Sequence, residues 1–151
     1  MNIISLFQVQ REKNKQIAID KNLNQYKLSA RKHLELYIKL SSLAENTKCY
    51  KYWLDNNSEI NKDIIFNKYL DFLGQLLILG IDRDYTDITE IKVSPNDYCL
   101  SDQFLNLYID LNDLIISHSK DHYLTLLEDS ISLGITLGYS ENSIIDSFIL
   151  R

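Results

Sequence analysis

Apolar side chains recur along this chain with the spacing of α-helices. Leu36, Leu40 and Leu43 fall at i, i+4 and i+7, which is one face of a helix. The same period appears in five other stretches. It predicts an all-α protein of about six helices, at residues 3–18, 29–47, 60–80, 101–117 and 121–137 and from 140 onward. In the fourth stretch the predicted apolar face consists of Phe104, Leu105, Tyr108, Leu111 and Ile115.

Polar and chain-breaking residues separate these stretches. Residues 55–62 are rich in Asn and predict a loop, and residues 81–100, which hold the one proline, predict a long mobile connection. Ser29 is a suitable N-cap for the second helix, and Gly80 and Gly138 are suitable C-terminal stops for the third and the fifth. A chain of 151 residues can bury a core of its own, so we expect a single domain over residues 1–151.

Composition and charge exclude some classes of function. The net charge of −5 disfavours nucleic-acid binding, because binding to a phosphate backbone needs a concentrated basic surface. The apolar run at 76–81 is too short to span a membrane, so no membrane partner is expected. Cys49 and Cys99 occur without a secretory signal, which predicts two reduced thiols in a cytoplasmic protein. An enzyme and an interaction module both fit the composition.

Four segments carry a resemblance to a known family. LELYIKLSSLAENTKCYKYW, at residues 34–53, is similar without gaps to the LLVELGELANETRCFKYW pattern, and FNKYLDFLGQLLILG, at 66–80, to LEEYVDCLHFLLSLG. LSDQFLNLYIDLNDLI, at 100–115, and LGITLGYSENSIIDSF, at 133–148, also match in order and spacing. These patterns belong to the all-α dimeric dUTPases, the dUTPase-2 branch of the MazG-like nucleotide pyrophosphohydrolases, which the chain resembles along nearly its whole length.

The resemblance implies a four-helix core of the all-α NTP pyrophosphatase type and a homodimer. It also implies hydrolysis of dUTP, and often dUDP, to dUMP with Mg²⁺ held by acidic residues on two facing helices. The ExxE acids of the family fall on Lys39 and Ser42, a further Glu falls on Asn46, and the ExxxD acids fall on Asn67 and Asp71. Asp71 is the one carboxylate kept. Because Mg²⁺ needs hard oxygen ligands, we expect no metal cofactor.

Lys39 has the simplest interpretation as a replacement for the ion. Glu35 precedes it by four residues on the same helix, the favourable order for an ion pair, and Asp71 is expected to face it across the helix pair. The first hypothesis is therefore a dUTPase-like protein that has lost Mg²⁺-dependent pyrophosphatase activity. It would act through a protein partner or through residual nucleotide binding.

Two other hypotheses remain open. One is an active Mg²⁺-dependent enzyme for dUTP, dUDP or a related nucleotide, with a rearranged site built from Glu35, Glu45 and Asp71. The other is a structural helical interaction module.

Further family positions suggest where a nucleotide would bind. By resemblance, a residual pocket would include Gln10, Lys51 and Trp53. Phe148 takes the place of a Tyr in the family pattern YxxKNxxNxxRQ, and the two Asn and the Arg of that tail fall beyond Arg151.

Two other sets of residues have metal-like spacing. His118 and His122 stand at i and i+4, but no HExxH motif accompanies them. Asp82, Asp84 and Asp87 lack the glycine and the final glutamate of a calcium-binding loop. Neither pattern predicts a metal site.

Overall fold

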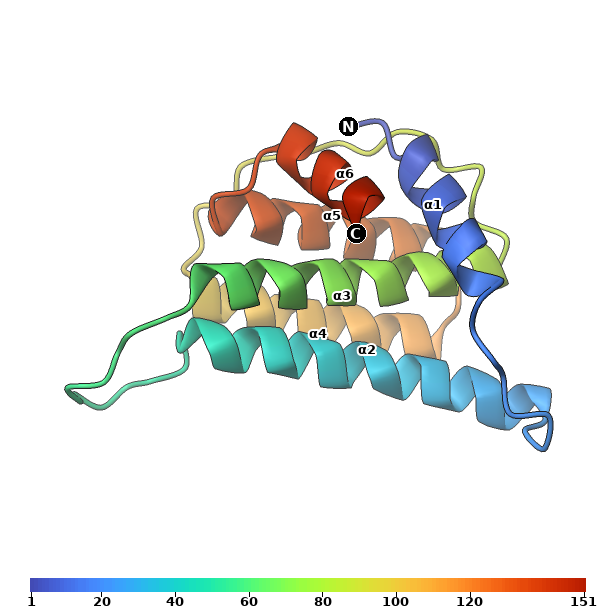
Figure 1. The fold of residues 1–151 in the computed structure, drawn as a ribbon. Helices are drawn as coiled ribbons and strands as arrows, with labels where there is room; N and C mark the ends of the chain where they lie inside the picture. Colours follow the sequence, from blue (N-terminus) through green and yellow to red (C-terminus); the bar gives the residue numbers. More distant parts are fainter.

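Six α-helices and no β-strand make up the computed structural model, which describes residues 1–151 (Figure 1). The predicted all-α class is confirmed. The helices are α1 (Ile4–Asn14), α2 (Gln25–Thr47), α3 (Lys62–Asp82), α4 (Leu100–Ile116), α5 (Lys120–Thr136) and α6 (Glu141–Leu150).

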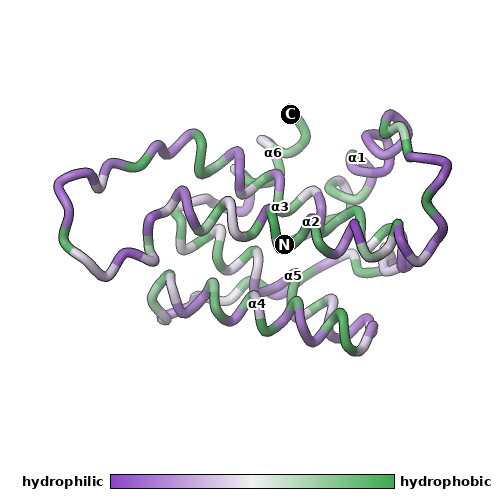
Figure 2. The backbone as a smooth tube through the Cα atoms, turned by 90° about the horizontal axis from the view of Figure 1, so that it is seen from below, coloured by the Kyte–Doolittle hydropathy of each residue, from purple (hydrophilic) through white to green (hydrophobic).

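Helix α3 lies at the centre, with α2 antiparallel beside it as its most extensive contact (Figure 1). Leu36, Leu40 and Leu43 of α2 are fully buried, as their spacing predicts. Helices α4 and α5 form a second pair, and α1 and α6 cover the other side of α3. Hydrophobic and hydrophilic residues are interspersed along the helices (Figure 2).

The central helix is apolar on several sides because other helices surround it. By length and composition α3 would also qualify as a membrane span, but 56% of its apolar window is buried inside the fold. That burial is what the core helix of a globular domain shows.

Side-chain caps fix where most helices begin. The Asn24 side chain accepts a hydrogen bond from Lys27 N at 2.8 Å, so α2 begins at Gln25, one turn before the predicted cap at Ser29. Ser29 lies inside the helix, where its carbonyl accepts a hydrogen bond from the His33 ring. Asn61 and Ser140 cap α3 and α6 in the same way as Asn24 caps α2.

Gly80 does not end α3, contrary to the sequence prediction. The helix continues to Asp82, and Gly80 is instead the point where Tyr123 of α5 packs against it. The Tyr123 hydroxyl donates a hydrogen bond to the Leu76 carbonyl at 2.9 Å, and a Cβ on Gly80 would lie 2.2 Å from that hydroxyl oxygen. Gly138, with φ of 99°, does end α5, as predicted.

The middle of the connection at 81–100, residues 88–91, packs against the start of the chain, although a mobile segment was expected there. The Ile3 amide donates to Thr89 O at 2.9 Å, and the Ile91 amide donates to Met1 O at 3.0 Å. Ile88 and Ile91 are buried. Main-chain pairing and these two apolar side chains hold the connection in place.

One acidic side chain is buried between α4 and α5. Asp110 is 8% exposed, and its Oδ2 has no hydrogen-bond partner. Burial, followed by the neighbouring carboxyl group of Asp129, raises the pKa of Asp110 to about 8. The folded protein therefore holds the proton on this carboxyl to higher pH than the unfolded chain does.

The two glycines of α3 provide a matched test of this packing. Gly80→Ala forces the new methyl group into Tyr123, and we expect a loss of about 1–3 kcal/mol in the free energy of unfolding. In Gly74→Ala the new methyl group lies 3.4 Å from its nearest neighbouring atom, which is an ordinary contact distance. The higher helix propensity of alanine should therefore raise the free energy of unfolding by up to about 1 kcal/mol. Urea unfolding followed by circular dichroism measures both. A stable Gly80→Ala protein would contradict the close approach of Tyr123.

Replacing Asp110 by Asn should change the pH dependence of stability. Between the ordinary aspartate pKa near 4 and the folded value of about 8, the unfolded chain binds fewer protons at this group than the folded one. Stability therefore falls as pH rises through that window. The Asp110→Asn protein has no such titrating group, so its free energy of unfolding should fall less between pH 4 and pH 8 than that of the unmodified chain. We expect the two falls to differ by about 1–3 kcal/mol. Chemical unfolding at the two pH values measures it. Parallel curves for the two proteins would refute it.

Candidate functional site

A cavity of about 230 Å³ lies where α1, α2, α3 and the end of α6 meet. Charged and polar side chains from all four regions line it. They include Gln10 and Lys13 from α1, Lys39 from α2, Asp71 and Gln75 from α3, and Arg151 after α6. The remaining wall is formed by Leu70, Gly74, Ile78 and Phe148.

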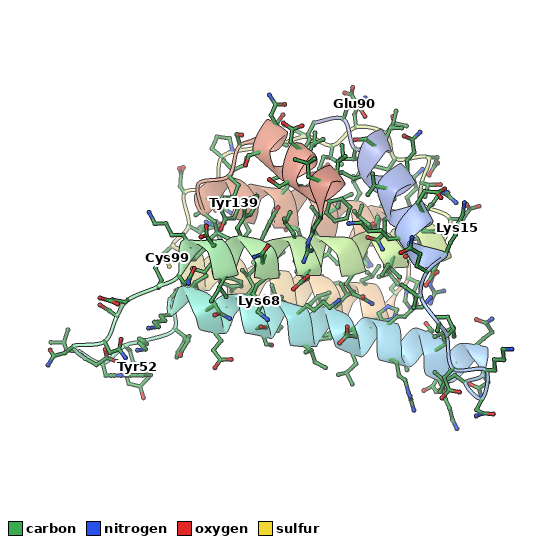
Figure 3. The ribbon with its side chains drawn as sticks, in the orientation of Figure 1. Lys15, Tyr52, Lys68, Glu90, Cys99 and Tyr139 are labelled. Carbon is green, nitrogen blue, oxygen red and sulfur yellow. The ribbon has the colours of Figure 1, made fainter.

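Two neighbouring cavities share residues with the first. A smaller one, of about 160 Å³, lies on the seam between α2 and α3 and shares Lys39 and Asp71 with it. Lys68 also lines the seam, and Figure 3 shows it between the two helices. A third cavity, of about 440 Å³, shares Lys39 and Gln75 with the first and has more apolar walls. We call the three together the cleft.

Each carboxylate in the cleft has a cation beside it. Lys39 Nζ lies 3.3 Å from Glu35 Oε2, one helical turn away. Asp71 forms its ion pair with Arg151, not with Lys39. Lys39 and Asp71 line the same two cavities, so the structure places them at one site and gives each a different partner.

Lys13 enters the cleft from α1 without a carboxylate partner. Its ammonium lies 3.4 Å from the Phe148 carbonyl oxygen and 4.6 Å from the centre of the Phe148 ring. Burial, and then the nearby positive charge of Arg151, lowers the pKa of Lys13. Two cations thus approach one another on the same wall.

The other positions expected from the family acids differ in placement. Ser42 lines the seam cavity with Lys39 and Asp71. The Asn46 side chain donates a hydrogen bond to Ser42 O at 2.7 Å, on its own helix, and Asn67 is exposed to solvent and lines none of the three cavities. The four-position acidic set is therefore reduced to one carboxylate facing a lysine and a serine.

This donor set does not fit Mg²⁺. A divalent ion of this size requires several oxygen ligands, including carboxylates free to turn toward it. Here Asp71 is paired with Arg151 and Glu35 with Lys39, and Lys39 would bring a positive charge to the ion. Nowhere in the chain do three or more His, Cys, Asp or Glu side chains come together as a metal site would need.

The pocket expected from Gln10, Lys51 and Trp53 is not assembled. Gln10 is buried and lines the cleft, but Lys51 and Trp53 lie in the loop after α2, where Figure 3 shows the neighbouring Tyr52 beyond the helix end. Lys51 Nζ and Trp53 Nε1 both donate to Asp55 Oδ2, at 2.8 and 3.2 Å. The hydrogen bond from Lys51 is the main cause that lowers the pKa of Asp55.

The two histidines with zinc-like spacing point to different partners. The His118 ring contacts the His33 ring edge-on, with centroids 4.9 Å apart, and His118 Nε2 lies 3.2 Å from an Arg83 guanidinium nitrogen. His122 Nδ1 lies 2.8 Å from Ser117 O. They share no site.

The aspartates considered for calcium, and Glu45, which was considered for a rearranged site, do not come together either. Asp82 pairs with Lys32 at 2.6 Å, and Asp87 pairs with Lys120. Asp84 has a positive φ in the turn after α3. Glu45 lines none of the three cavities of the cleft.

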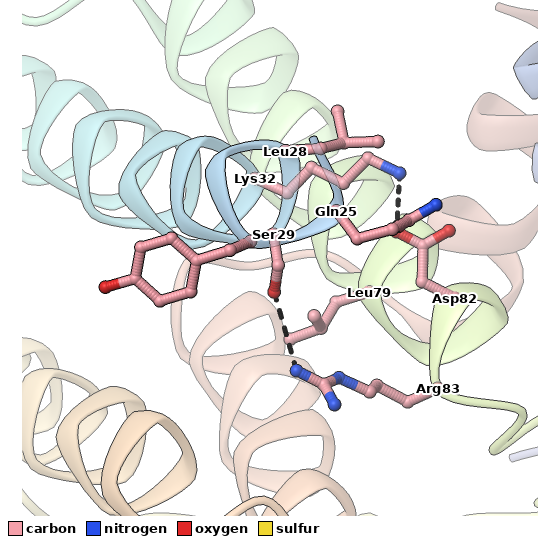
Figure 4. A pocket seen from close by; sticks show the side chains of 8 residues that line it. Gln25, Leu28, Ser29, Lys32, Leu79, Asp82 and Arg83 are labelled. Carbon is pink, nitrogen blue, oxygen red and sulfur yellow. Dashed lines mark hydrogen bonds and ion pairs between the residues drawn. The ribbon is translucent and has the colours of Figure 1, made fainter. Parts of the chain in front are cut away.

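Another hollow lies near the start of α2 and the end of α3 (Figure 4). Within it Lys32 pairs with Asp82, and Arg83, which has no carboxylate partner, contacts the Ser29 hydroxyl at 3.5 Å. None of the positions expected from the family acids lines this hollow, whereas Lys39, Ser42 and Asp71 line the cleft, so the cleft is the better candidate site.

Sequence reasoning missed two residues of the cleft, Lys13 and Arg151. Each follows a recognised position by three residues, Lys13 after Gln10 and Arg151 after Phe148, and so falls on the same helical face. That spacing was the available signal. Their approach to Asp71 depends on how α1 and α6 pack on α3, which the spacing does not determine.

Comparison with known proteins agrees with this arrangement of helices and positions. The chain matches no curated protein and no solved structure. A family model described as dUTPase, of the dUTPase-2 type, matches residues 2–151, which is almost the whole chain. The chain therefore belongs to the dUTPase-2 family.

Proposed function

We propose that this member of the dUTPase-2 family has lost the family's Mg²⁺-dependent hydrolysis and acts by binding. The observation that carries the proposal is the replacement of a metal site by ion pairs. Where the family has acids, Lys39 stands beside Glu35, and the remaining Asp71 is paired with Arg151.

The electrostatics of the cleft support the proposal. A cluster of carboxylates attracts a divalent ion because the acids repel one another until the ion neutralises them. In this chain Lys39 and Arg151 provide that neutralisation themselves. Both remaining carboxylates, Glu35 and Asp71, are engaged in these ion pairs, whereas general-base catalysis requires a carboxylate directed at the attacking water.

The binding role has two forms in this proposal, a protein partner or a residual nucleotide. The protein partner includes a second copy of the chain, since members of the family are typically oligomeric. We place this activity in the cytoplasm, where Cys49 and Cys99, which form no disulfide, would remain reduced.

An apolar face on α2 and α4 supports the homodimer. Tyr37 donates a hydrogen bond to Asn112 at 2.6 Å and joins the two helices. On their outer sides large apolar residues are more than half exposed: Leu34 and Ile38 on α2, and Leu105 and Ile109 on α4. Adjacent exposed apolar side chains on two helices are typical of surfaces that are covered in an assembly.

A turnover assay tests the loss of hydrolysis. We expect no release of phosphate or pyrophosphate when the purified protein is incubated with each deoxynucleoside triphosphate and with dUDP, in Mg²⁺ or in Mn²⁺. The reason is that no set of carboxylates in the cleft is free to hold the ion. Turnover that disappears in an Asp71→Ala protein would show that an active, rearranged site exists and would overturn the proposal.

Restoring the acids should restore ion binding. In the Lys39→Glu, Ser42→Glu, Asn67→Glu triple variant, all four family positions are again carboxylates, and those at 39, 42 and 71 line the seam cavity together with Glu35. We expect Mg²⁺ to raise its melting temperature by several degrees. The unmodified chain should show no such shift. As a control for added charge alone, Lys27→Glu, Ser41→Glu, Asn22→Glu places the same changes outside the cleft and should not respond to Mg²⁺. Equal responses of all three proteins would contradict the assignment of the site.

The dimer face can be tested by adding charge to it. We expect the unmodified chain to sediment as a dimer at micromolar concentration and the Ile38→Glu, Ile109→Glu double variant to sediment as a monomer, because burying two charges in an apolar interface is costly. Ile60→Glu, a similarly exposed isoleucine outside the face, is the control and should remain dimeric. A double variant that stays dimeric would place the interface elsewhere.

A further inference from the structure

The cleft contains an unusual concentration of positive charge for this protein. The chain has a net charge of −5, yet three cations line the 230 Å³ cavity, namely Lys13, Lys39 and Arg151, against the single carboxylate of Asp71. Three positive side chains and one negative leave a local excess of two positive charges. Lys68 borders the adjoining seam cavity and adds another cation, while Glu35 adds another carboxylate.

The cations come from separate parts of the fold and converge on one space. Lys13 belongs to α1, Lys39 to α2 and Arg151 follows α6, so packing and not local sequence brings them together. Lys13 is the least compensated, because its ammonium faces a carbonyl oxygen and an aromatic ring and no carboxylate. The effect of Arg151 in lowering the pKa of Lys13 agrees with two cations in close proximity. An anion between them would relieve this repulsion.

The adjoining part of the cleft has a different character. The 440 Å³ cavity shares Lys39, Gln75 and Ile78 with the cationic cavity. Its apolar residues are Ile17, Ile19, Leu28 and the shared Ile78, and Ile17 and Ile19 are about half exposed. Arg31, Lys32 and Asp82 also line it. A ligand that spans both cavities would have a multiply charged anionic end and a less polar end.

We propose that the cleft binds the di- or triphosphate of a nucleotide directly, without a divalent ion. The side chains of Lys13, Lys39 and Arg151 contact the phosphate oxygens, and the nucleoside lies toward Ile17 and Ile19. Ammonium and guanidinium groups form strong charge-assisted hydrogen bonds with phosphate. This inference rests on the proposed function, because it assigns a ligand to the same altered site.

The proposal predicts an inverted response to magnesium. In a metal-dependent site the ion bridges protein and phosphate, so Mg²⁺ strengthens nucleotide binding. In a site lined by cations, Mg²⁺ bound to the phosphates removes the negative charge that the lysines and the arginine would contact. The free polyphosphate is then the better ligand, and adding Mg²⁺ weakens binding.

Isothermal titration calorimetry in EDTA and in excess Mg²⁺ tests this sign, with dUTP and inorganic tripolyphosphate as the two probes. We expect both probes to bind in EDTA, dUTP more tightly, and both to bind about 5-fold or more weakly in Mg²⁺. No binding of either probe in EDTA, or tighter binding in Mg²⁺, overturns the proposal. Equal affinity for the two probes overturns the assignment of the apolar part to a nucleoside.

Matched variants identify the side chains that take part. Lys13→Ala and Lys39→Ala should each weaken dUTP binding in EDTA about 5- to 10-fold, whereas Lys39→Arg should keep most of it. Lys15→Ala on the end of α1 and Lys27→Ala on α2 remove the same charge outside the cleft and should leave binding unchanged. Circular dichroism melting confirms that every variant is folded. Equal losses in the cleft variants and the controls would show a general charge effect and refute the site.

The two proposals fail in different ways. Phosphate and pyrophosphate released in the Mg²⁺ samples would overturn the loss of hydrolysis and leave the binding result in EDTA unaffected. Absence of binding in EDTA with no turnover would overturn the metal-free site alone.

Discussion

The contact between α2 and α3 is the constraint on which the rest of the structure depends. Leu36, Leu40 and Leu43 are fully buried against the central helix, which fixes the rotation of α2 about its axis. Once that rotation is fixed, the polar residues next to the leucine stripe must face α3 across a narrow seam. Lys39 and Asp71 therefore occupy neighbouring positions whatever their chemistry. The apolar packing maintains the geometry of a site, and the polar substitutions alone decide what the site can bind.

The ion pairs in the cleft contribute little to stability. Glu35, Lys39, Asp71 and Arg151 all have side chains that are between about a third and a half exposed. Pairs with this exposure typically contribute about 0–1 kcal/mol, because water screens them. The α2 and α3 pair is stabilised by the buried leucines, and the close approach of Tyr123 at Gly80 holds α5 against α3. Substitutions in the cleft are consequently tolerated by the fold, and the site can change its chemistry while the helices stay in place.

Helical periodicity was sufficient to predict the class, the number of helices and the buried face of α2. The apolar face of α4 was predicted in part: Phe104 and Leu111 are buried as expected, but Leu105 and Ile115 are exposed. Leu107 and Leu114 are buried in their place. Helix α4 has apolar residues on both its buried and its exposed sides. The sequence period therefore does not show which of these residues face the core. The role of Gly80 and the anchoring of 81–100 depend on contacts between distant segments, with Tyr123 and with the first residues of the chain. The same is true of Lys13 and Arg151, whose place in the cleft is set by the packing of α1 and α6.

Binding and turnover make different demands on these residues, which explains how one can persist without the other. Holding a polyphosphate requires compensating charge, and flexible lysine and arginine side chains provide it. Turnover requires groups that act more strongly on the transition state than on the bound nucleotide, including a base to take a proton from the attacking water. Each carboxylate in the cleft is held by a cation, Glu35 by Lys39 and Asp71 by Arg151, and an anion in the cleft would compete for those same cations. In the proposed complex, ligand binding would therefore be coupled to the release of a carboxylate from its ion pair. Under the proposed function, the substitutions supply charge for holding a polyphosphate and leave out the set of acids that would hold a catalytic ion.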